Sequence, residues 1–416
     1  MRKTINSGHI LIAGTLDTKG EELLFLRRCL EAAGASTRVV DFGVLGDPMF
    51  TPDVAKEEIA ACAGESAAAL REAGDRGRSV AAMQRGFAAW CRSGPDLPAG
   101  VISIGGSAGT AIATAGMREF PIGLPKVMVS TMASGDVRPY VGTSDIVMMY
   151  SVADFTGLNR LTRTILTNAA HAAAGMCSIG AGARSETSER TLLAATMFGV
   201  TTPCVNRVKE LVEAAGYELL VFHATGTGGQ AMEKLVRDGF IKGVLDITTT
   251  ELADELVGGV LSAGPHRLEA AGAVGVPQVV SLGALDMVNF GAPQTVPERF
   301  RGRLFYPHNP AVTLMRTTPE ENAQLGEILG RKLSAARGPV TLLLPLGGVS
   351  AIDAPGKPFH DAAADEQLFA AVRRSAGANV KLVEYAGHIN DEAFARQIVA
   401  ELLPMLGSAA APGDSL

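Results

Sequence analysis

The sequence predicts an α/β protein of two Rossmann-like domains with mainly parallel sheets, related to each other by an internal repeat. The chain has 416 residues, more than one ordinary domain holds, and its 47% hydrophobic residues and 48 glycines are typical of a tightly turned globular protein. Residues 9–42 have the pattern strand, polar loop, helix, strand, and the same order returns at residues 191–223. We therefore predict domains at residues 1–180 and 191–408, joined by a small, polar linker at residues 178–190.

The composition argues against several classes of partner. The formal net charge is −6 and no run of Lys and Arg interleaves with aromatic residues, so we expect no nucleic-acid partner. No apolar stretch reaches the roughly 18 residues of a membrane span, and the N-terminus shows no apolar signal core, so we expect a cytoplasmic protein without a membrane partner. The five cysteines lack C-x-x-C spacing, which predicts neither a disulfide framework nor a zinc knuckle.

The functional prediction depends most on residues 101–114. A β-branched and apolar run ends in two glycines, and small helix-forming residues follow, so the expected order is buried strand, tight turn and helix. The first N–H groups of such a helix are unpaired and carry a partial positive charge that suits a phosphate. The stretch is neither a P-loop nor a dinucleotide fingerprint, and a turn that only packs tightly is the alternative. The residues assigned to this anion-binding turn are Gly105, Gly106, Ser107, Gly109 and Thr110.

A second polar loop follows the first predicted strand. Ligands bind at the carboxyl edge of parallel sheets, and this loop lies at the carboxyl end of its strand. Lys19 can meet a phosphate, and Asp17 with a neighbouring threonine can hold Mg²⁺, which prefers oxygen ligands. A polar turn in which Asp17 or Thr18 caps the next helix is the alternative. The nucleotide-binding residues assigned to this loop are Gly14, Thr15, Asp17, Thr18 and Lys19.

Two more short polar turns of the first half join the predicted site. One follows a strand at residues 126–130, and the other precedes an apolar run at residues 146–152. Both turns are expected at the same edge of the sheet as the loops above. The residues assigned here are Ser130, Thr131, Gly142 and Thr143, with Asp136 as a second candidate ligand for Mg²⁺.

Residues 52–90 are rich in alanine and predict two helices, at residues 54–73 and 78–91, which flank the site. The arginines of this region are unevenly spaced, so we expect most of them in solvent, with one reaching a phosphate as the alternative. These arginines are Arg76, Arg78, Arg85 and Arg92.

The second half carries its own glycine loop after a predicted strand. Gly226, Gly228 and Ala231 fit G-x-G-x-x-A, and Asp246 lies 20 residues beyond Gly226 at the end of the next strand, which is the pattern of an NAD site. The loop lies in the middle of the chain and does not open a complete mononucleotide-binding pair, so another anionic ligand is preferred. The substrate-binding residues assigned to it are Gly226, Gly228 and Gly229.

Later loops supply candidates for acid, base and substrate contacts. Asn289 is expected in a loop at residues 283–291, and Pro307 and Pro310 are expected to hold His308 and Asn309 in a stiff extended loop. The histidines are scattered singly without an H-x-x-x-H pair, so their spacing does not predict zinc. The candidate catalytic residues are His308, His388 and Arg316, and the further candidate substrate-binding residues are Asn289, Asn309, Gly347 and Gly348.

Several of these blocks together resemble one known family, the ATP-binding proteins typified by the N-terminal half of the tomato mosaic virus resistance protein. The likeness covers nearly the whole chain. It implies two Rossmann-like domains, an ATP site in the first domain and self-association into a homo-oligomer. The segments that carry it are residues 14–20, 103–110, 145–168, 223–232, 278–291 and 305–316.

Two classes of function follow as hypotheses. In the first, the protein is an enzyme that uses ATP and Mg²⁺ on a small acidic or polyhydroxy metabolite at a cleft between the domains, with Lys19 neutralising phosphate charge and His308 or His388 as acid or base. In the second, ATP is a structural or regulatory ligand that controls partner binding. An NAD-dependent dehydrogenase using the Gly226 loop is the third possibility.

Overall fold

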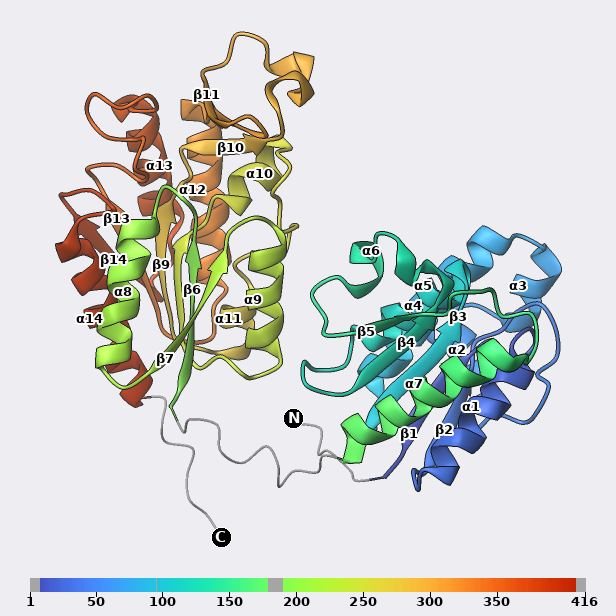
Figure 1. Ribbon diagram of the computed structural model, residues 1–416. Coiled ribbons are helices and arrows are strands. Elements are labelled where there is room, and N and C mark those ends of the chain that lie inside the picture. The colour runs from blue at the N-terminus through green and yellow to red at the C-terminus, as the bar shows by residue number, and fades with distance from the viewer. Residues whose placement is uncertain (1–7, 95, 179–189, 409–416) are drawn as a thin grey trace. The chain divides into compact units, whose positions relative to one another are not determined.

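The computed structural model describes residues 8–94, 96–178 and 190–408. The chain divides into two compact units between Thr187 and Ser188, called here the first and second unit (Figure 1). Most of the predicted linker, residues 179–189, lies outside the described residues. Within the described ranges, no helix combines the length and apolar character that a membrane crossing needs.

The first unit contains a five-stranded parallel sheet with the order β2-β1-β3-β4-β5. Its strands are β1 (Ile10–Gly14), β2 (Thr37–Asp41), β3 (Gly100–Gly105), β4 (Lys126–Ser130) and β5 (Val147–Tyr150). The central strands β1, β3 and β4 are buried along their whole length. This burial explains their nearly continuous apolar sequence, because a parallel sheet is covered on both faces.

Helices cover both faces of this sheet (Figure 1). One face carries α1 (Gly20–Ala32) and α7 (Arg160–Ser178), and the other carries α2 (Lys56–Cys62), α3 (Ala67–Ala73), α4 (Arg76–Ser93) and α5 (Ser107–Met117). Two short helices, η1 (Thr131–Ser134) and α6 (Arg138–Val141), follow β4. Successive side chains of a strand point to opposite faces, so Ile10 and Ile12 pack under α1 and α7, whereas Leu11 packs under α4 and α5.

The prediction of two helices in residues 52–90 is wrong, because this region forms α2, α3 and α4. Gly64 and Gly74 have positive φ values, of 72° and 62°, and end the first two of these helices. The side chains of Ser66 and Asp75 then cap α3 and α4. The alanine-rich helical periodicity continues through both breaks, so it does not reveal where one helix ends and the next begins.

The second unit contains a six-stranded parallel sheet with the order β14-β13-β9-β8-β6-β7. Its strands are β6 (Leu192–Met197), β7 (Glu218–His223), β8 (Val244–Thr248), β9 (Gln278–Gly283), β13 (Val340–Pro345) and β14 (Val380–Tyr385). Numbered within the unit, the order is 2-1-3-4-5-6, which is the order of the first unit with one strand added. The two units therefore share a doubly wound topology.

Helices also cover both faces of the second sheet. One face carries α8 (Thr202–Ala214) and α14 (Glu392–Ser408), and the other carries α9 (Thr227–Arg237), α10 (Glu251–Val257), α11 (Ala270–Val274), α12 (Pro319–Ser334) and α13 (Ala362–Ser375). In β8, Val244 packs toward α9 and α11 while Leu245 packs toward α8 and α14. The α/β class with mainly parallel sheets is thus confirmed.

A small antiparallel sheet with the order β10-β12-β11 interrupts the second unit between β9 and α12. Its strands are β10 (Met287–Phe290), β11 (Phe305–Asn309) and β12 (Val312–Arg316), with η2 (Pro293–Thr295) and η3 (Glu298–Phe300) between β10 and β11. The predicted loops that carry Asn289 and His308 are therefore strands. Pro307 fits in β11 because this is an edge strand, where a missing N–H is tolerated.

Arg267 holds a fully buried ion-pair cluster in the second unit. Its guanidinium lies 2.5 Å from Asp246 Oδ2 and 2.6 Å from Glu251 Oε2. Glu233 Oε1 is 3.5 Å away and accepts the backbone N–H of Leu268. One guanidinium thus faces three carboxylates that water does not reach. Removing it would leave buried charge uncompensated.

We expect Arg267→Met to destabilise the second unit by roughly 3–5 kcal/mol, the usual effect of breaking a buried ion pair. Urea unfolding followed by far-ultraviolet circular dichroism measures the loss. Arg331→Met, on the exposed side of α12, is the matched control and should leave the transition within about 0.5 kcal/mol. A loss no larger than that of the control would show that the cluster is not needed for stability.

Candidate functional site

The strand order places a crevice at the carboxyl edge of the first sheet. The chain leaves β1 for β2 on one side, whereas β3 leads to β4 on the other. The loops after β1 and β3, residues 15–19 and 105–109, diverge at this point. In doubly wound sheets, ligands bind where the winding direction changes.

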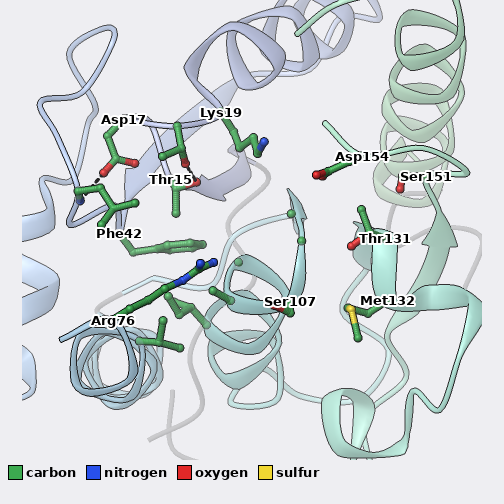
Figure 2. Close-up of a pocket in the computed structure, with 18 of the residues that line it drawn as sticks. Thr15, Asp17, Lys19, Phe42, Arg76, Ser107, Thr131, Met132, Ser151 and Asp154 are labelled. Carbon is green, nitrogen blue, oxygen red and sulfur yellow. Dashed lines mark hydrogen bonds between the residues drawn. The ribbon is translucent and has the colours of Figure 1, made fainter. Parts of the chain in front are cut away.

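A cavity of about 640 Å³ lies at this crevice (Figure 2). Its size is that of a site for a cofactor or small molecule. Polar residues after β1, β3 and β4 line it together with apolar residues from other elements. Of the predicted nucleotide-binding residues, those that line the cavity are Thr15, Asp17, Thr18, Lys19, Gly105, Gly106, Ser107, Gly109 and Thr131.

The start of α5 supplies the donors of this cavity. Within the described residues, no hydrogen bond is found for the N–H groups of Ser107, Ala108 and Gly109, and the first helical bond runs from Thr110 N to Gly106 O at 2.9 Å. These three N–H groups, called here the anion slot, belong to residues that line the cavity. Gly105 is needed for the tight turn, because a Cβ there would lie 3.0 Å from Gly109 Cα. A helix start of this kind attracts anions.

Lys19 brings a positive charge to the same cavity. It precedes α1 and its ammonium donates to the backbone carbonyl of Phe155, which follows β5. The side chain therefore joins the loop after β1 to the segment that follows β5, and Figure 2 shows its ammonium pointing toward Asp154 of that segment. An anion bound at the slot would lie at the same sheet edge as this ammonium.

Asp17 supports a loop in this structure. Its Oδ2 accepts the N–H groups of Leu45 at 2.7 Å and Gly46 at 3.0 Å. Its Oδ1 is buried, has no hydrogen-bond partner among the described residues, and lies against Gly43, where a Cβ would be 2.4 Å away. Access of Mg²⁺ to this oxygen would require the carboxylate to turn. The geometry thus assigns Asp17 the positioning of residues 43–46, where the sequence predicted a metal ligand.

Asp136 does not join the cavity. It is exposed and forms an ion pair with Arg138 at 2.8 Å, which lowers the pKa of its carboxyl to about 2. Gly142 ends α6 with a φ of 53°, and Thr143 lies in the turn that follows. None of these residues is among those that line the cavity. Asp136 lies between η1 and α6, whereas Gly142 and Thr143 follow α6, so these residues lie outside the cavity lining.

Three of the predicted residues do not line the cavity but contact the elements whose loops line it. Thr110 Oγ1 and Ser130 Oγ lie 2.6 Å apart and join α5 to the end of β4. Ser130 Oγ also accepts Met132 N at 2.9 Å, which fixes the turn that carries Thr131. Gly14 packs against Leu23 of α1, where a Cβ would be 2.5 Å from the leucine side chain. These contacts hold the lining loops in place.

Sequence reasoning missed the walls of the cavity. Residues after β2 and on α4 and α5 form one apolar wall, and residues at the end of β5 form part of the other. Arg76 was considered only as one of four arginines, and it lines the cavity (Figure 2). Both β2 and β5 end at the same sheet edge, which is the signal that could have found these residues. The missed residues include Phe42, Val44, Leu45, Val80, Ile112, Met132, Tyr150, Ser151, Val152 and Asp154.

The corresponding point of the second sheet, between β6 and β8, is closed. Thr201 Oγ1 and Thr248 Oγ1 lie 2.7 Å apart, and Thr196 Oγ1 donates to Asp246 Oδ1 at 2.7 Å. All four side chains are buried. Threonine contacts thus occupy the position that is a cavity in the first unit.

The glycine loop of the second unit is also closed. Glu251 Oε1 accepts the N–H groups of Gly226 at 2.7 Å and Gly229 at 3.1 Å. A Cβ on Gly228 would lie 1.9 Å from His223 O, so this glycine is needed for the turn itself. Two of the N–H groups that the sequence offers to a substrate or to NAD, those of Gly226 and Gly229, are therefore bound by a side chain of the same chain.

The other predicted substrate-binding residues are dispersed in the second unit. Asn289 is buried and donates to Asp254 Oδ2 at 2.6 Å. Asn309 is exposed on β11 and accepts the N–H of Ala311. Gly347 and Gly348 use their own N–H groups on Gly387 O and Pro345 O. The structure gives these residues separate structural roles.

The candidate catalytic residues fall into three different environments. His308 is exposed on the edge strand β11. Both ring nitrogens of His388 are engaged, Nε2 2.8 Å from Ser350 O and Nδ1 accepting Asn390 N at 3.0 Å. Arg316 is buried and lies 2.6 Å from Asp365 Oδ1. None of the three lines the cavity of the first unit.

Comparison with known proteins gives the family. The N-terminal domain of the uncharacterised protein family UPF0261 matches residues 8–181, and its C-terminal domain matches residues 190–406. The chain belongs to this family. A UPF0261 protein of Clostridium tetani is 51% identical over 400 residues, covering 95% of this chain and 98% of that protein. A UPF0261 protein of Rhizobium meliloti is 52% identical over 395 residues, covering 94% and 97%.

The tomato likeness is confirmed at the level of the family. The ToMV resistance protein Tm-1(GCR237) of Solanum lycopersicum is 41% identical over 426 residues. The alignment covers 96% of this chain and 56% of the tomato protein. Among solved structures, a UDP-N-acetylglucosamine 2-epimerase from Rickettsia bellii aligns over 96% of both chains with 12% identity and a TM-score of 0.22, which is too low to support any inference.

We expect inorganic pyrophosphate to stabilise the first unit, because its anion slot is open. Trp90 is the single tryptophan of the chain and lies in α4, so its fluorescence reports thermal unfolding of the first unit. Saturating pyrophosphate should raise this melting temperature by a few degrees. Gly106→Val should abolish the rise. An equal rise in this variant, or none in the unchanged protein, would contradict the assignment of the slot.

Proposed function

We propose that the first unit binds ATP together with Mg²⁺ in the cavity between the β1 and β3 loops. The observation that carries the proposal is the anion slot at the point where the winding direction changes. Its three N–H groups lack partners within the described residues, and Lys19 lies on the same cavity. A polyphosphate would accept hydrogen bonds from the three N–H groups and from the Lys19 ammonium together, whereas a neutral ligand would not balance their positive charge.

The apolar walls suit the rest of a nucleotide. Phe42, Val80 and Ile112 line one side of the cavity, and Arg76 lies on the same wall. Its side chain is directed into the cavity (Figure 2). Aromatic and guanidinium groups both stack on planar rings. A base would thus bury its faces there while its phosphates reach the anion slot.

Asp154 is the ligand that we propose for Mg²⁺, beside the predicted ligand Asp17, which also lines the cavity. Its carboxylate is exposed at the cavity and accepts Phe155 N at 2.8 Å, and Thr131 adds a hydroxyl to the lining. These oxygen ligands match the preference of Mg²⁺, which would also be bound by phosphate oxygens of the nucleotide. The bound ion would neutralise phosphate charge.

The resemblance stated above adds support, since it implies ATP binding in the first domain. The name of the tomato relative refers to virus resistance, and this chain spans only 56% of that protein. We therefore do not extend the antiviral role to this chain. Homo-oligomer formation stays a prediction of the same resemblance.

The geometry supports nucleotide binding more directly than catalysis. Among the described residues that line the cavity, none is a histidine or a cysteine. An ATP-dependent reaction on a small acidic or polyhydroxy metabolite stays a prediction, as does its alternative, a regulatory role of bound ATP. Measuring ADP release in the presence of candidate metabolites separates these two functions.

We expect calorimetric titration to show one ATP site whose affinity depends on Lys19. Lys19→Ala removes a charged donor and should weaken binding roughly tenfold to a hundredfold. Gly106→Val should abolish binding: the φ of −82° accepts a side chain, and its Cβ, 3.8 Å from Thr131 Oγ1, points toward the lining. Arg28→Ala, on the exposed side of α1, is the matched control and should bind normally.

Asp154→Asn tests the assignment of Mg²⁺ in the same titration. The variant should bind ATP as the unchanged protein does in excess chelator, but should lose the gain in affinity that Mg²⁺ provides. Unchanged ATP affinity in both Lys19→Ala and Gly106→Val would overturn the site. A full response to Mg²⁺ in Asp154→Asn would overturn only the metal assignment.

A further inference from the structure

A second cluster of chemically capable side chains lies in the second unit, between β13 and α13. Asp353 and Asp365 are buried, whereas the side chain of His360 is 34% exposed. One ligand atom from each of the three residues can be chosen so that all lie within 4.8 Å of one another. Spacing in the sequence did not indicate this group, because the turn at residues 348–353 folds the chain back toward α13.

Carboxyl groups outnumber guanidinium groups in this cluster. Asp286 is fully buried beside it, with its Oδ2 accepting the hydroxyl of Ser350 at 2.7 Å. Arg316 is the guanidinium that faces these carboxylates, 2.6 Å from Asp365 Oδ1 and 3.7 Å from Asp353 Oδ1. One guanidinium thus faces three buried carboxylates. Buried carboxylates need compensating charge, and a divalent cation would supply it.

A buried oxygen of Asp353 points into the middle of the group. Its Oδ2 accepts Val349 N at 2.9 Å, but its Oδ1 accepts no hydrogen bond from any described residue. This Oδ1 lies 3.9 Å from His360 Nδ1. Buried oxygens normally have a hydrogen-bond donor or a metal as partner. This oxygen has the Arg316 guanidinium 3.7 Å away but no hydrogen bond, so it is available to a cation bound at this position.

We propose that Asp353, His360 and Asp365 form a binding site for a first-row divalent cation such as Zn²⁺ or Mn²⁺. One imidazole and two carboxylates are a ligand set for these ions, whereas Ca²⁺ needs six to eight oxygen ligands. Arg316 donates to Asp365 and holds this carboxylate in place, as outer partners of metal ligands commonly do. The partly exposed imidazole gives the ion a route from solvent. The site does not depend on nucleotide binding in the first unit.

The experiment uses the full chain after treatment with a chelator and its removal, without nucleotide. Calorimetric titration with ZnCl₂ and MnCl₂ should show one site that His360→Ala weakens at least about tenfold. His171→Ala, which removes an exposed histidine of α7, is the matched control and should bind as the unchanged protein does. His360→Ala is preferred to changes of the buried aspartates because it is expected to fold.

Two results would overturn the site. In the first, neither metal binds to the unchanged chain. In the second, His360→Ala binds both metals with unchanged affinity, which would place any metal on other groups, such as the thiols of the chain. The cluster would then be an ion-pair network only. Circular dichroism of both variants checks that folding is preserved.

Discussion

The unpaired N–H groups at the start of α5 are the constraint on which the candidate site depends. Every helix begins with donors that its own carbonyls cannot satisfy, and these donors require another partner. At α12 and α13 the partners are side chains, Thr318 and Asp361, which cap the helix. At α5 the residue before the helix is Gly106, which has no side chain. Within the described residues, the partner must therefore be water or a ligand.

The two units share the same strand order, but the carboxyl edge of the sheet holds a cavity in the first unit and is closed at the corresponding point of the second. In the first unit, glycines at the end of β3 leave the carboxyl edge open, and Lys19 adds a charge to it. In the second, Thr201 and Thr248 meet across the edge, and Glu251 accepts the N–H groups of the Gly226 loop. The Glu251 carboxylate thus makes, at the start of α9, the interaction that a phosphate would otherwise make. We therefore expect nucleotide binding in one unit only.

Burial explains why the second unit can close in this way. Glu251 satisfies the backbone donors and also pairs with Arg267, which in turn pairs with Asp246. Asp246, which lies at the spacing of an NAD site in the sequence, is thus part of the interior. A glycine pattern and an acidic residue at the right spacing do not reveal which partner the fold supplies to each.

Local patterns predicted the sheets and the lining glycines well, because apolar runs and glycine turns are properties of adjacent residues. Phe42 and Asp154 were missed because the segments after β2 and β5 join the site only through the strand order, which brings both strand ends to the same sheet edge. The hydrogen bonds of Asp17 to Leu45 and Gly46 were not predicted, since these partners come from a loop that only the fold brings near, and its role as a metal ligand stays a prediction.

The metal cluster escaped prediction for a related reason. Asp353, His360 and Asp365 do not follow the spacing of a helical ligand pair, and a tight turn assembles them. The antiparallel sheet was missed because Asn289 and His308 were predicted in loops, whereas they lie in β10 and β11. Whether such a short segment pairs as a strand depends on the neighbours that the fold supplies.

Hydrogen exchange of the full chain with and without ATP and Mg²⁺ tests the central claim most directly, because it reads the backbone N–H groups themselves. Bound nucleotide should slow exchange in the peptides that contain Ser107, Ala108 and Gly109. Exchange at Gly226 and Gly229 should not change, since Glu251 already accepts their N–H groups. Slowing at residues 226–229 without slowing at the start of α5 would contradict the account.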